Sequence, residues 1–192
     1  AKPLYDPARD FAYVAYLGYA PNVLVIRPST PAKNVKELIA LAKAHPGQLT
    51  YASPGVGSTN HLAGEMFRLA TGIDITHVPY KGGAPAMIDL LAGQVPMLMA
   101  SPTAFGPHIR SGRLRAIAVT SPRRFQTMPD VPTLAESGLA GFDHVEWWMF
   151  VGPARIPEAV EAKVHRDLSA VVAQADFKSR VLELDVETFP NT

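Results

Sequence analysis

The sequence contains no cysteine, which excludes disulfide bonds, thiol catalysis and cysteine-ligated metal sites. Charge is also sparse and balanced: 18 Lys and Arg stand against 17 Asp and Glu, giving a formal net charge of +1. Binding to a nucleic acid or to an anionic membrane surface requires a basic patch, and no block of basic residues occurs along the chain. Neither is therefore expected as a partner.

Long apolar runs are missing as well. No segment approaches the roughly 20 uninterrupted apolar residues that a membrane helix needs, so no direct membrane insertion is expected. The first residues, AKPLYDPARDF, lack the basic, apolar, small-residue order of a signal peptide. The 18 prolines are spread along the chain, which predicts many short elements instead of one proline-rich linker. Composition alone leaves the cellular compartment open.

Apolar residues make up 47% of the 192 residues, enough to bury one core or two small ones. Residues 22–27 form an apolar run between two prolines, which predicts a buried strand. Asn34, with Glu37 three positions later, has the pattern of a capping box, and the apolar residues that follow have helical spacing as far as Pro46-Gly47. A strand followed by an amphipathic helix is the first repeat of a longer alternation.

The alternation continues with strands at 49–53, 74–78, 95–100 and 114–119 and with helices after Ser58, at 84–92 and at 103–111. Such alternation predicts an α/β fold with a parallel-rich sheet, because parallel neighbours need a crossover helix between them. The proline- and glycine-rich residues 121–144 are expected to leave this sheet. A strand at 145–152 and helices at 157–172 and 176–184 are expected to follow.

Three loops follow strands of the predicted sheet, where helix N-termini offer free N–H groups to anions. The strongest candidate is the loop 53–60, whose two glycines allow close approach of the backbone to a ligand. It lacks the Gly-Lys-Ser/Thr of a P-loop and the third glycine of a dinucleotide site, so a carboxylate suits it better than a nucleotide. An ordinary turn with a serine cap has the same pattern. The candidate ligand-binding residues are Ser53, Gly55, Gly57, Ser58, Thr59, Asn60, Tyr80, Lys81, Gly82, Ala100 and Ser101.

Catalytic and metal-binding patterns are weak. The histidines near these loops lack the spacing of a zinc site, and the acidic residues occur singly. No Gly-x-Ser-x-Gly nucleophile elbow is present. The residues considered and set aside are His61, His77, His108, Asp89, Asp130 and Glu136. We therefore predict no catalytic residue, no metal and no cofactor.

Two pairs of large side chains lie on predicted strands. Trp147 and Trp148 are adjacent, so their rings must point to opposite faces, one into the core and one towards a pocket. Met97 and Met99 share one face and are expected in the sheet core.

Several motifs occur in a characteristic order along the chain. They are Asp6-Pro7-x-x-Asp10-Phe11, Pro21-Asn22-Val23-Leu24-Val25, Pro46-Gly47-x-Leu49-x-Tyr51-Ala52-Ser53, His61-Leu62-Ala63-Gly64-Glu65, His77-Val78-Pro79-Tyr80-Lys81-Gly82, Ile117-Ala118-Val119-Thr120-Ser121 and Pro129-Asp130-Val131-Pro132-Thr133-x-x-Glu136-x-Gly138. With these motifs the sequence resembles the tripartite tricarboxylate transporter substrate-binding proteins, the Bug-type periplasmic receptors.

The resemblance implies a periplasmic, two-lobed receptor of type II periplasmic-binding-protein architecture. Such a receptor closes over a small ligand, often a carboxylate, and presents it to membrane transporter subunits without catalysis. Residues 20–125 would form the second lobe, and residues 1–19 and 140–192 parts of the first. The ligand would be held by the loops 53–60, 80–84 and 100–103, and Trp147 would close the pocket wall. A ligand-sensing subunit of a two-component system, or an enzyme on the same fold, are the alternatives.

Two departures from the family pattern modify this expectation. Relatives begin with a stretch that supplies the first lobe's half of the site and continue beyond the end of this chain, so a fragment is expected. Relatives also often carry Asp or Asn in the loop after strand 95–100, where this chain has Ala100-Ser101. This difference favours a dicarboxylate or an aromatic carboxylate over an amino acid.

Overall fold

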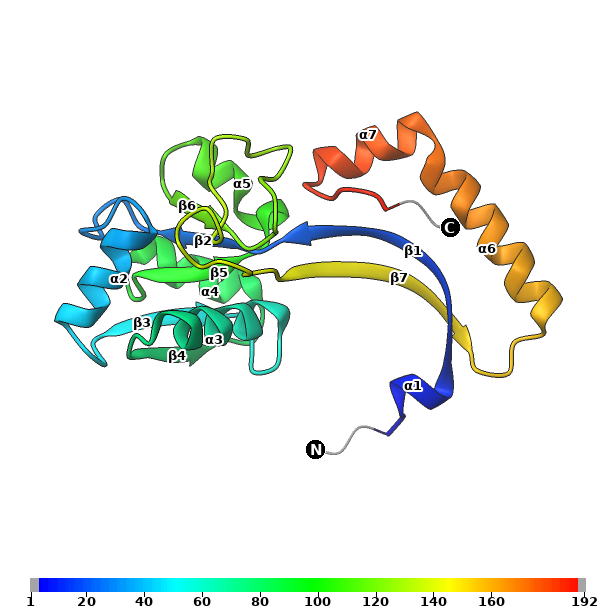
Figure 1. The fold of residues 1–192 in the computed structure, drawn as a ribbon, viewed down its shortest axis with the longest axis horizontal. Helices are drawn as coiled ribbons and strands as arrows, with labels where there is room; N and C mark the ends of the chain where they lie inside the picture. The colour runs from blue at the N-terminus through cyan, green and yellow to red at the C-terminus, as the bar shows by residue number, and fades with distance from the viewer. Residues whose placement is uncertain (1–3, 190–192) are drawn as a thin grey trace. The chain divides into compact units, whose positions relative to one another are not determined.

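The computed structural model describes residues 4–189, which form two compact units (Figure 1). One unit is the continuous stretch Ala20–Glu146, and the other combines the residues up to Tyr19 with those from Trp147 onwards. Whether these units correspond to the two expected lobes stays a prediction.

The continuous unit is built on a five-stranded sheet with the order β4-β3-β5-β2-β6. Its strands are β2 (Val23–Ile26), β3 (Leu49–Ser53), β4 (Ile75–Pro79), β5 (Met97–Ala100) and β6 (Arg115–Val119). Its helices are α2 (Val35–Ala44), α3 (Thr59–Thr71), α4 (Gly83–Ala92) and α5 (Pro102–Arg110). The predicted alternation of strands and helices in an α/β fold is confirmed.

The directions of the strands differ from a fully parallel sheet. β3 runs parallel to β4 and β5, whereas β2 runs antiparallel to both of its neighbours, β5 and β6. Four of the five strands thus run in the same direction, but two of the four strand pairings are antiparallel, so the expectation of parallel pairing is wrong for β2. A short, fully buried strand has the same apolar pattern in either direction, so sequence periodicity could not reveal this.

The predicted starts of the helices α2 and α3 are confirmed. Asn34 caps α2, with its Oδ1 accepting from the Glu37 N–H at 2.9 Å, and a Glu37 carboxylate oxygen accepts from the Lys33 N–H at 2.7 Å. Ser58 caps α3, with its Oγ accepting from the His61 N–H at 3.2 Å, and Gly72 ends that helix in the left-handed region at φ 63°.

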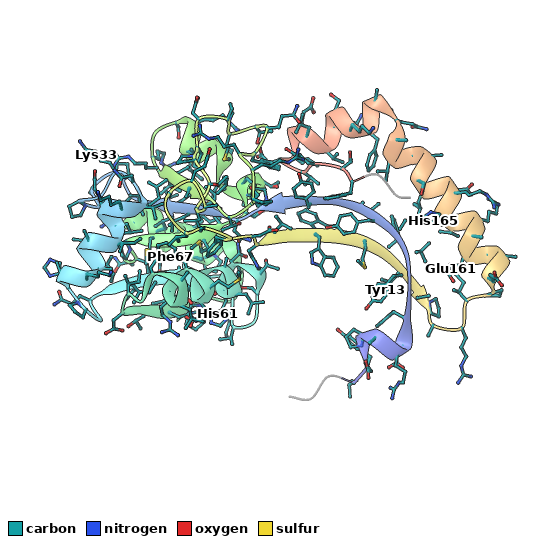
Figure 2. The ribbon with its side chains drawn as sticks, in the orientation of Figure 1. Tyr13, Lys33, His61, Phe67, Glu161 and His165 are labelled. Atoms are coloured by element: carbon teal, nitrogen blue, oxygen red, sulfur yellow. The ribbon has the colours of Figure 1, made fainter. Side chains whose placement is uncertain are left out.

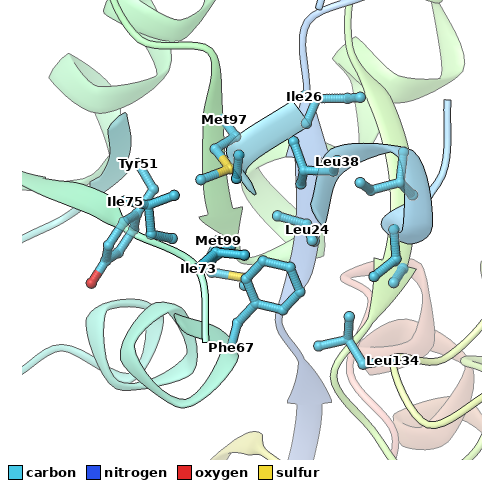
Figure 3. Packing of buried hydrophobic residues seen from close by; sticks show 14 of the residues in the cluster. Leu24, Ile26, Leu38, Tyr51, Phe67, Ile73, Ile75, Met97, Met99 and Leu134 are labelled. Atoms are coloured by element: carbon cyan, nitrogen blue, oxygen red, sulfur yellow. The ribbon is translucent and has the colours of Figure 1, made fainter. Parts of the chain in front are cut away.

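The core of this unit lies between the sheet and its helices (Figure 3). Met97 and Met99 are 1% and 2% exposed, which confirms their expected place in the core, and Phe67 and Leu38 pack into the same cluster. Residues 121–144 contribute no strand to the sheet, as expected, but they stay within this unit. Leu134 and Phe142 belong to the same core, and the Leu134 N–H donates to the Val119 carbonyl at 2.9 Å. The turn-rich composition of this segment gave no indication that Leu134 and Phe142 pack into the core.

Close packing between α3 and β3 depends on Gly64. A Cβ added at this position would lie 2.2 Å from Cε2 of Tyr51, whose hydroxyl donates to Glu65 at 2.7 Å. We therefore expect Gly64→Ala to destabilise the fold by about 1–3 kcal/mol, measured by chemical denaturation. Gly83→Ala is the matched control, because a Cβ there would meet nothing within 4 Å. Equal stability of both variants would contradict this account of the packing.

The second unit contains most of a long two-stranded sheet, in which β1 (Phe11–Pro21) pairs with β7 (Val145–Pro153). It also contains α1 (Pro7–Asp10), α6 (Glu158–Ala173) and α7 (Ala175–Glu183). His165 of α6, labelled in Figure 2, contacts the Val14 carbonyl through Nδ1 at 2.7 Å. No helix within residues 4–189 combines the length and apolar character needed to cross a membrane.

The two tryptophans of β7 differ from the expectation. Trp147 is 54% exposed and Trp148 is 40% exposed, so the prediction that one of them lies in the core is wrong. No residue of β7 is buried. Successive side chains of a strand point to opposite faces, which places the two rings on opposite sides of β7. This alternation does not indicate whether other residues pack over either face.

Candidate functional site

The first two candidate loops are joined at one edge of the sheet. β3, β4 and β5 run in the same direction, so their carboxyl ends meet at this edge and are followed by α3, α4 and α5 (Figure 1). The Tyr80 N–H donates to the Ser53 carbonyl at 3.0 Å, and the Gly82 N–H donates to the Pro54 carbonyl at 2.8 Å. The loops 53–60 and 80–84 therefore form a single hydrogen-bonded surface.

This surface carries backbone N–H groups that have no acceptor within residues 4–189. They belong to Thr59 and Asn60 at the start of α3 and to Gly83 and Ala84 at the start of α4. Unpaired N–H groups and the helix dipole give each of these N-termini a partial positive charge. Together they provide donors for the oxygens of a small anion.

The loop backbone requires glycine at two positions. Gly57 has φ +82°, and nothing lies within 4 Å of a Cβ added there. At Gly55, where φ is +154°, an added Cβ would lie 3.3 Å from the Tyr80 carbonyl oxygen. Glycine thus permits the left-handed turn at one position and the close approach of the two loops at the other.

The serine hydroxyls of the first loop bond within the loop. Ser53 is fully buried, and its Oγ accepts from the Gly55 N–H at 3.2 Å and lies 2.7 Å from Nε2 of His77. Ser58 caps α3 and donates to the Gly55 carbonyl at 2.8 Å. Both hydroxyls therefore hold the loop in shape, and direct contact of either with a ligand stays a prediction.

The remaining predicted residues occupy varied environments. The Tyr80 hydroxyl donates to Asp89 at 2.7 Å, and burial, followed by this bond to a carboxylate, raises the pKa of Tyr80 to about 12. Lys81 is exposed, Ala100 is fully buried, and Ser101 is the N-cap of α5 without a side-chain cap bond. Trp147 belongs to the other compact unit, so its part in the site stays a prediction.

A buried polar network beside the start of α3 was not anticipated from the sequence. Asn22 is fully buried and accepts from Asn60 through Oδ1, and its N–H donates to Thr120 Oγ1 at 2.8 Å. Thr120 Oγ1 donates to the His144 carbonyl at 2.6 Å. His144 Nε2 in turn donates to the Thr59 carbonyl at 3.0 Å. The network thus joins the first turn of α3 to residues distant in sequence.

The antiparallel direction of β2 explains why Asn22 and Thr120 lie at this edge. Val23, the first residue of β2, pairs with Ala100 and Val119, the last residues of β5 and β6. The start of β2 therefore lies beside the carboxyl ends of its neighbours. The candidate loops follow parallel strands, whereas Asn22 precedes the antiparallel strand β2.

Two imidazole rings support the first loop. The rings of His61 and His77 lie 4.1 Å apart between centroids, and His77 also stacks on Tyr51 at 4.9 Å. The Gly57 N–H donates to Nδ1 of His61, which is labelled in Figure 2, at 3.2 Å. Burial, followed by the neighbouring His61, lowers the pKa of His77.

This lowered pKa predicts a pH dependence of stability. Below the ordinary histidine pKa of 6.5, the unfolded chain takes up a proton at His77 while the folded chain does not. The free energy of unfolding should therefore fall as the pH drops through 6.5 towards the lower folded pKa. Denaturation of the wild type and of His77→Gln between pH 7.5 and about 5 tests this. A loss of the same size in both proteins would exclude His77 as its source.

Two further features limit the kinds of site available. Among the described residues, no group of three or more His, Asp or Glu could hold a metal ion. A groove of about 450 Å³ lies between α3 and residues 138–142. It is lined by Met66, Leu69, Ala70, Gly138, Leu139, Ala140, Gly141 and Phe142. Without a charged or polar side chain, this groove is poorly suited to a carboxylate.

A family model and several curated relatives match this chain over most of its length. The family model described as "Tripartite tricarboxylate transporter family receptor" matches residues 1–192. A "UPF0065 protein in tcbD-tcbE intergenic region" of Pseudomonas sp. (strain P51) is 34% identical over 185 residues, which are 96% of this chain and 55% of that protein. Protein BugT of Bordetella pertussis is 40% identical over 149 residues, 78% of this chain and 46% of BugT. The chain spans about half the length of the curated relatives it matches.

Solved structures show the same fold. "R. palustris Rpa4515 with adipate" superposes with a TM-score of 0.90 at 32% identity, covering 98% of this chain and 63% of that one. "MatC (Rpa3494) from Rhodopseudomonas palustris with bound malate" gives a TM-score of 0.85 at 30% identity, covering 98% and 64%. Both superpositions support the expected α/β fold, in which helices flank the sheet.

Proposed function

Since the chain belongs to the tripartite tricarboxylate transporter receptor family, we propose that it is part of a periplasmic receptor that binds a small carboxylate and delivers it to membrane transporter subunits. The observation that carries the proposal is the pair of adjacent helix N-termini, α3 and α4, with unpaired N–H groups at one sheet edge. Two similar structures hold the carboxylates adipate and malate, which supports the ligand class.

Binding in this proposal depends on local electrostatics. The net charge of +1 produces no strong long-range field, so the carboxylate is captured by short-range hydrogen bonds. The N–H groups of Thr59, Asn60, Gly83 and Ala84 would donate to the carboxylate oxygens, each charge-assisted bond adding about 1.5–3 kcal/mol. The bonds between the loops hold these donors in place before the ligand arrives, which reduces the entropy lost on binding.

Thermal unfolding against a panel of carboxylates tests this function. The panel holds C4 to C8 mono-, di- and aromatic carboxylates and acidic amino acids. The protein should include any segments that flank residues 1–192 and should be freed of co-purified ligand. A ligand present at about 100 times its dissociation constant should stabilise the protein by about 2.7 kcal/mol. If no member of the panel raises the melting temperature, the carboxylate-receptor function is contradicted.

A further inference from the structure

A carboxylate of the protein itself lies at the start of α3. Glu146 Oε1 accepts from the Thr59 hydroxyl at 2.7 Å, and Thr59 is the first residue of that helix. The other oxygen of Glu146 has no hydrogen-bond or ion-pair partner within residues 4–189, and no Lys or Arg there lies within 4.0 Å of the carboxylate. The half-buried Glu146 therefore adds an unpaired negative charge beside the free N–H groups.

The surrounding network fixes the position of this carboxylate. His144, two residues before Glu146, is bonded to the Thr59 carbonyl through its ring and to Thr120 through its own carbonyl. Glu146 and the first turn of α3 are thus connected both through side chains and through the short segment between residues 144 and 146. A ligand that reaches the free N–H groups must also lie close to Glu146.

A second unpaired group lies in the same network. Asn22 is fully buried, and its Nδ2 has no acceptor among the described residues, although its Oδ1 accepts from Asn60. A buried donor without a partner is costly, so it indicates that an oxygen atom belongs nearby. The start of α3 therefore combines free backbone donors with the Glu146 acceptor, and the unpaired Asn22 donor lies buried in the same hydrogen-bonded network.

From this arrangement we infer that Glu146 selects carboxylates that carry a hydrogen-bond donor, a hydroxyl or an ammonium group, close to the carboxylate. The inference rests on the proposed function and adds the ligand class. The free N–H groups take the ligand carboxylate, while the free oxygen of Glu146 accepts from the ligand's donor. An unsubstituted diacid places its negative charge beside Glu146 without a donor that pairs with this carboxylate, whereas a hydroxyl or an ammonium group supplies that donor. Ala100-Ser101 alone favours a dicarboxylate or an aromatic carboxylate over an amino acid, whereas Glu146 favours a ligand with a hydroxyl or an ammonium group.

Calorimetric titration with two matched series of diacids tests this selectivity. The first series is succinate, malate and aspartate, and the second is glutarate, 2-hydroxyglutarate and glutamate. Within each series only the substituent changes, from hydrogen to hydroxyl to ammonium. In the series whose length fits the site, the wild type should bind the amino acid most tightly and the unsubstituted diacid at least about 10-fold more weakly. An unsubstituted diacid that binds as tightly as the others would overturn the inference.

The Glu146→Gln variant tests whether the charge of Glu146 determines the selectivity. The amide oxygen can still accept from Thr59, but the negative charge is gone. Affinity for the amino acid should fall at least about 10-fold, while affinity for the unsubstituted diacid stays or rises. Glu37→Gln is the matched control, because it removes the same charge from the first turn of α2 and should leave the rank order unchanged.

The outcomes distinguish this inference from the proposed function. Equal weakening of all three ligands by Glu146→Gln would overturn the selectivity role while leaving the receptor function intact. Failure of the wild type to bind any carboxylate in the series or in the thermal panel would overturn both. The rank order in the wild type is independent of whether any variant folds.

Discussion

Gly57→Val should abolish carboxylate binding, with affinity reduced at least about 100-fold, while the protein remains folded. Gly57 has φ +82°, a conformation that a β-branched residue adopts only with strain. Relief of this strain would move the loop and break the bond from the Gly57 N–H to His61. Since Thr59 begins α3 two residues later, its N–H group and that of Asn60 would lose their alignment with the ligand. Titration calorimetry measures the loss.

Gly112→Val provides the matched control for backbone strain. Gly112 has φ +72° and open space around an added Cβ, but it follows α5 and lies outside the candidate loops. It should cost stability to a similar extent, about 1–2 kcal/mol, without changing affinity. Gly57→Asn should retain more binding than Gly57→Val, because asparagine tolerates the left-handed region. If Gly57→Val binds the carboxylate with wild-type affinity, the loop 53–60 is not part of the binding site.

Thr120→Val should lower the free energy of unfolding by about 2–4 kcal/mol, the largest stability loss that we predict. Valine has nearly the same shape as threonine, so no cavity forms. The fully buried hydroxyl, however, accepts from the Asn22 N–H and donates to the His144 carbonyl. Its removal leaves both backbone groups without these partners. Chemical denaturation measures the difference.

Thr120→Ser distinguishes the contribution of the hydroxyl to stability from that of the methyl group. Serine keeps both hydrogen bonds and loses one buried methyl group, a cost of about 1 kcal/mol. Thr120→Ser should therefore be clearly more stable than Thr120→Val. If the two are equally stable, or if valine is the better replacement, the hydroxyl does not hold the network together.

Features determined by local sequence could be predicted. Asn34 and Glu37 formed the expected cap because a helix N-terminus needs acceptors for its first N–H groups. Gly72 and Gly93 end α3 and α4 in the left-handed region that favours glycine. Such signals lie within a few residues of the element they shape, and they located the strands and helices of the sheet.

Features that depend on distant contacts could not be predicted. The direction of β2 is determined by its neighbours β5 and β6, which come much later in the chain. The exposure of Trp147 and Trp148 depends on which residues pack against β7, and the alternating direction of side chains along a strand does not indicate this. Leu134 and Phe142 reach the core from a segment whose composition is typical of a loop.

The candidate site combines both kinds of information. The loops 53–60 and 80–84 share an edge because parallel strands end together, so a sequence pattern could place them side by side. Asn22, Thr120, His144 and Glu146 meet Thr59 and Asn60 only through tertiary contacts. No motif joins these positions in the sequence.

The most direct test of the account is a crystal structure of the protein with the carboxylate that binds it most tightly. We predict a carboxylate oxygen within about 3.2 Å of the backbone nitrogens of Thr59 or Asn60, with Gly83 or Ala84 contacting the same ligand. A ligand held elsewhere, for example in the apolar groove beside Met66, Leu69 and Phe142, would contradict the account.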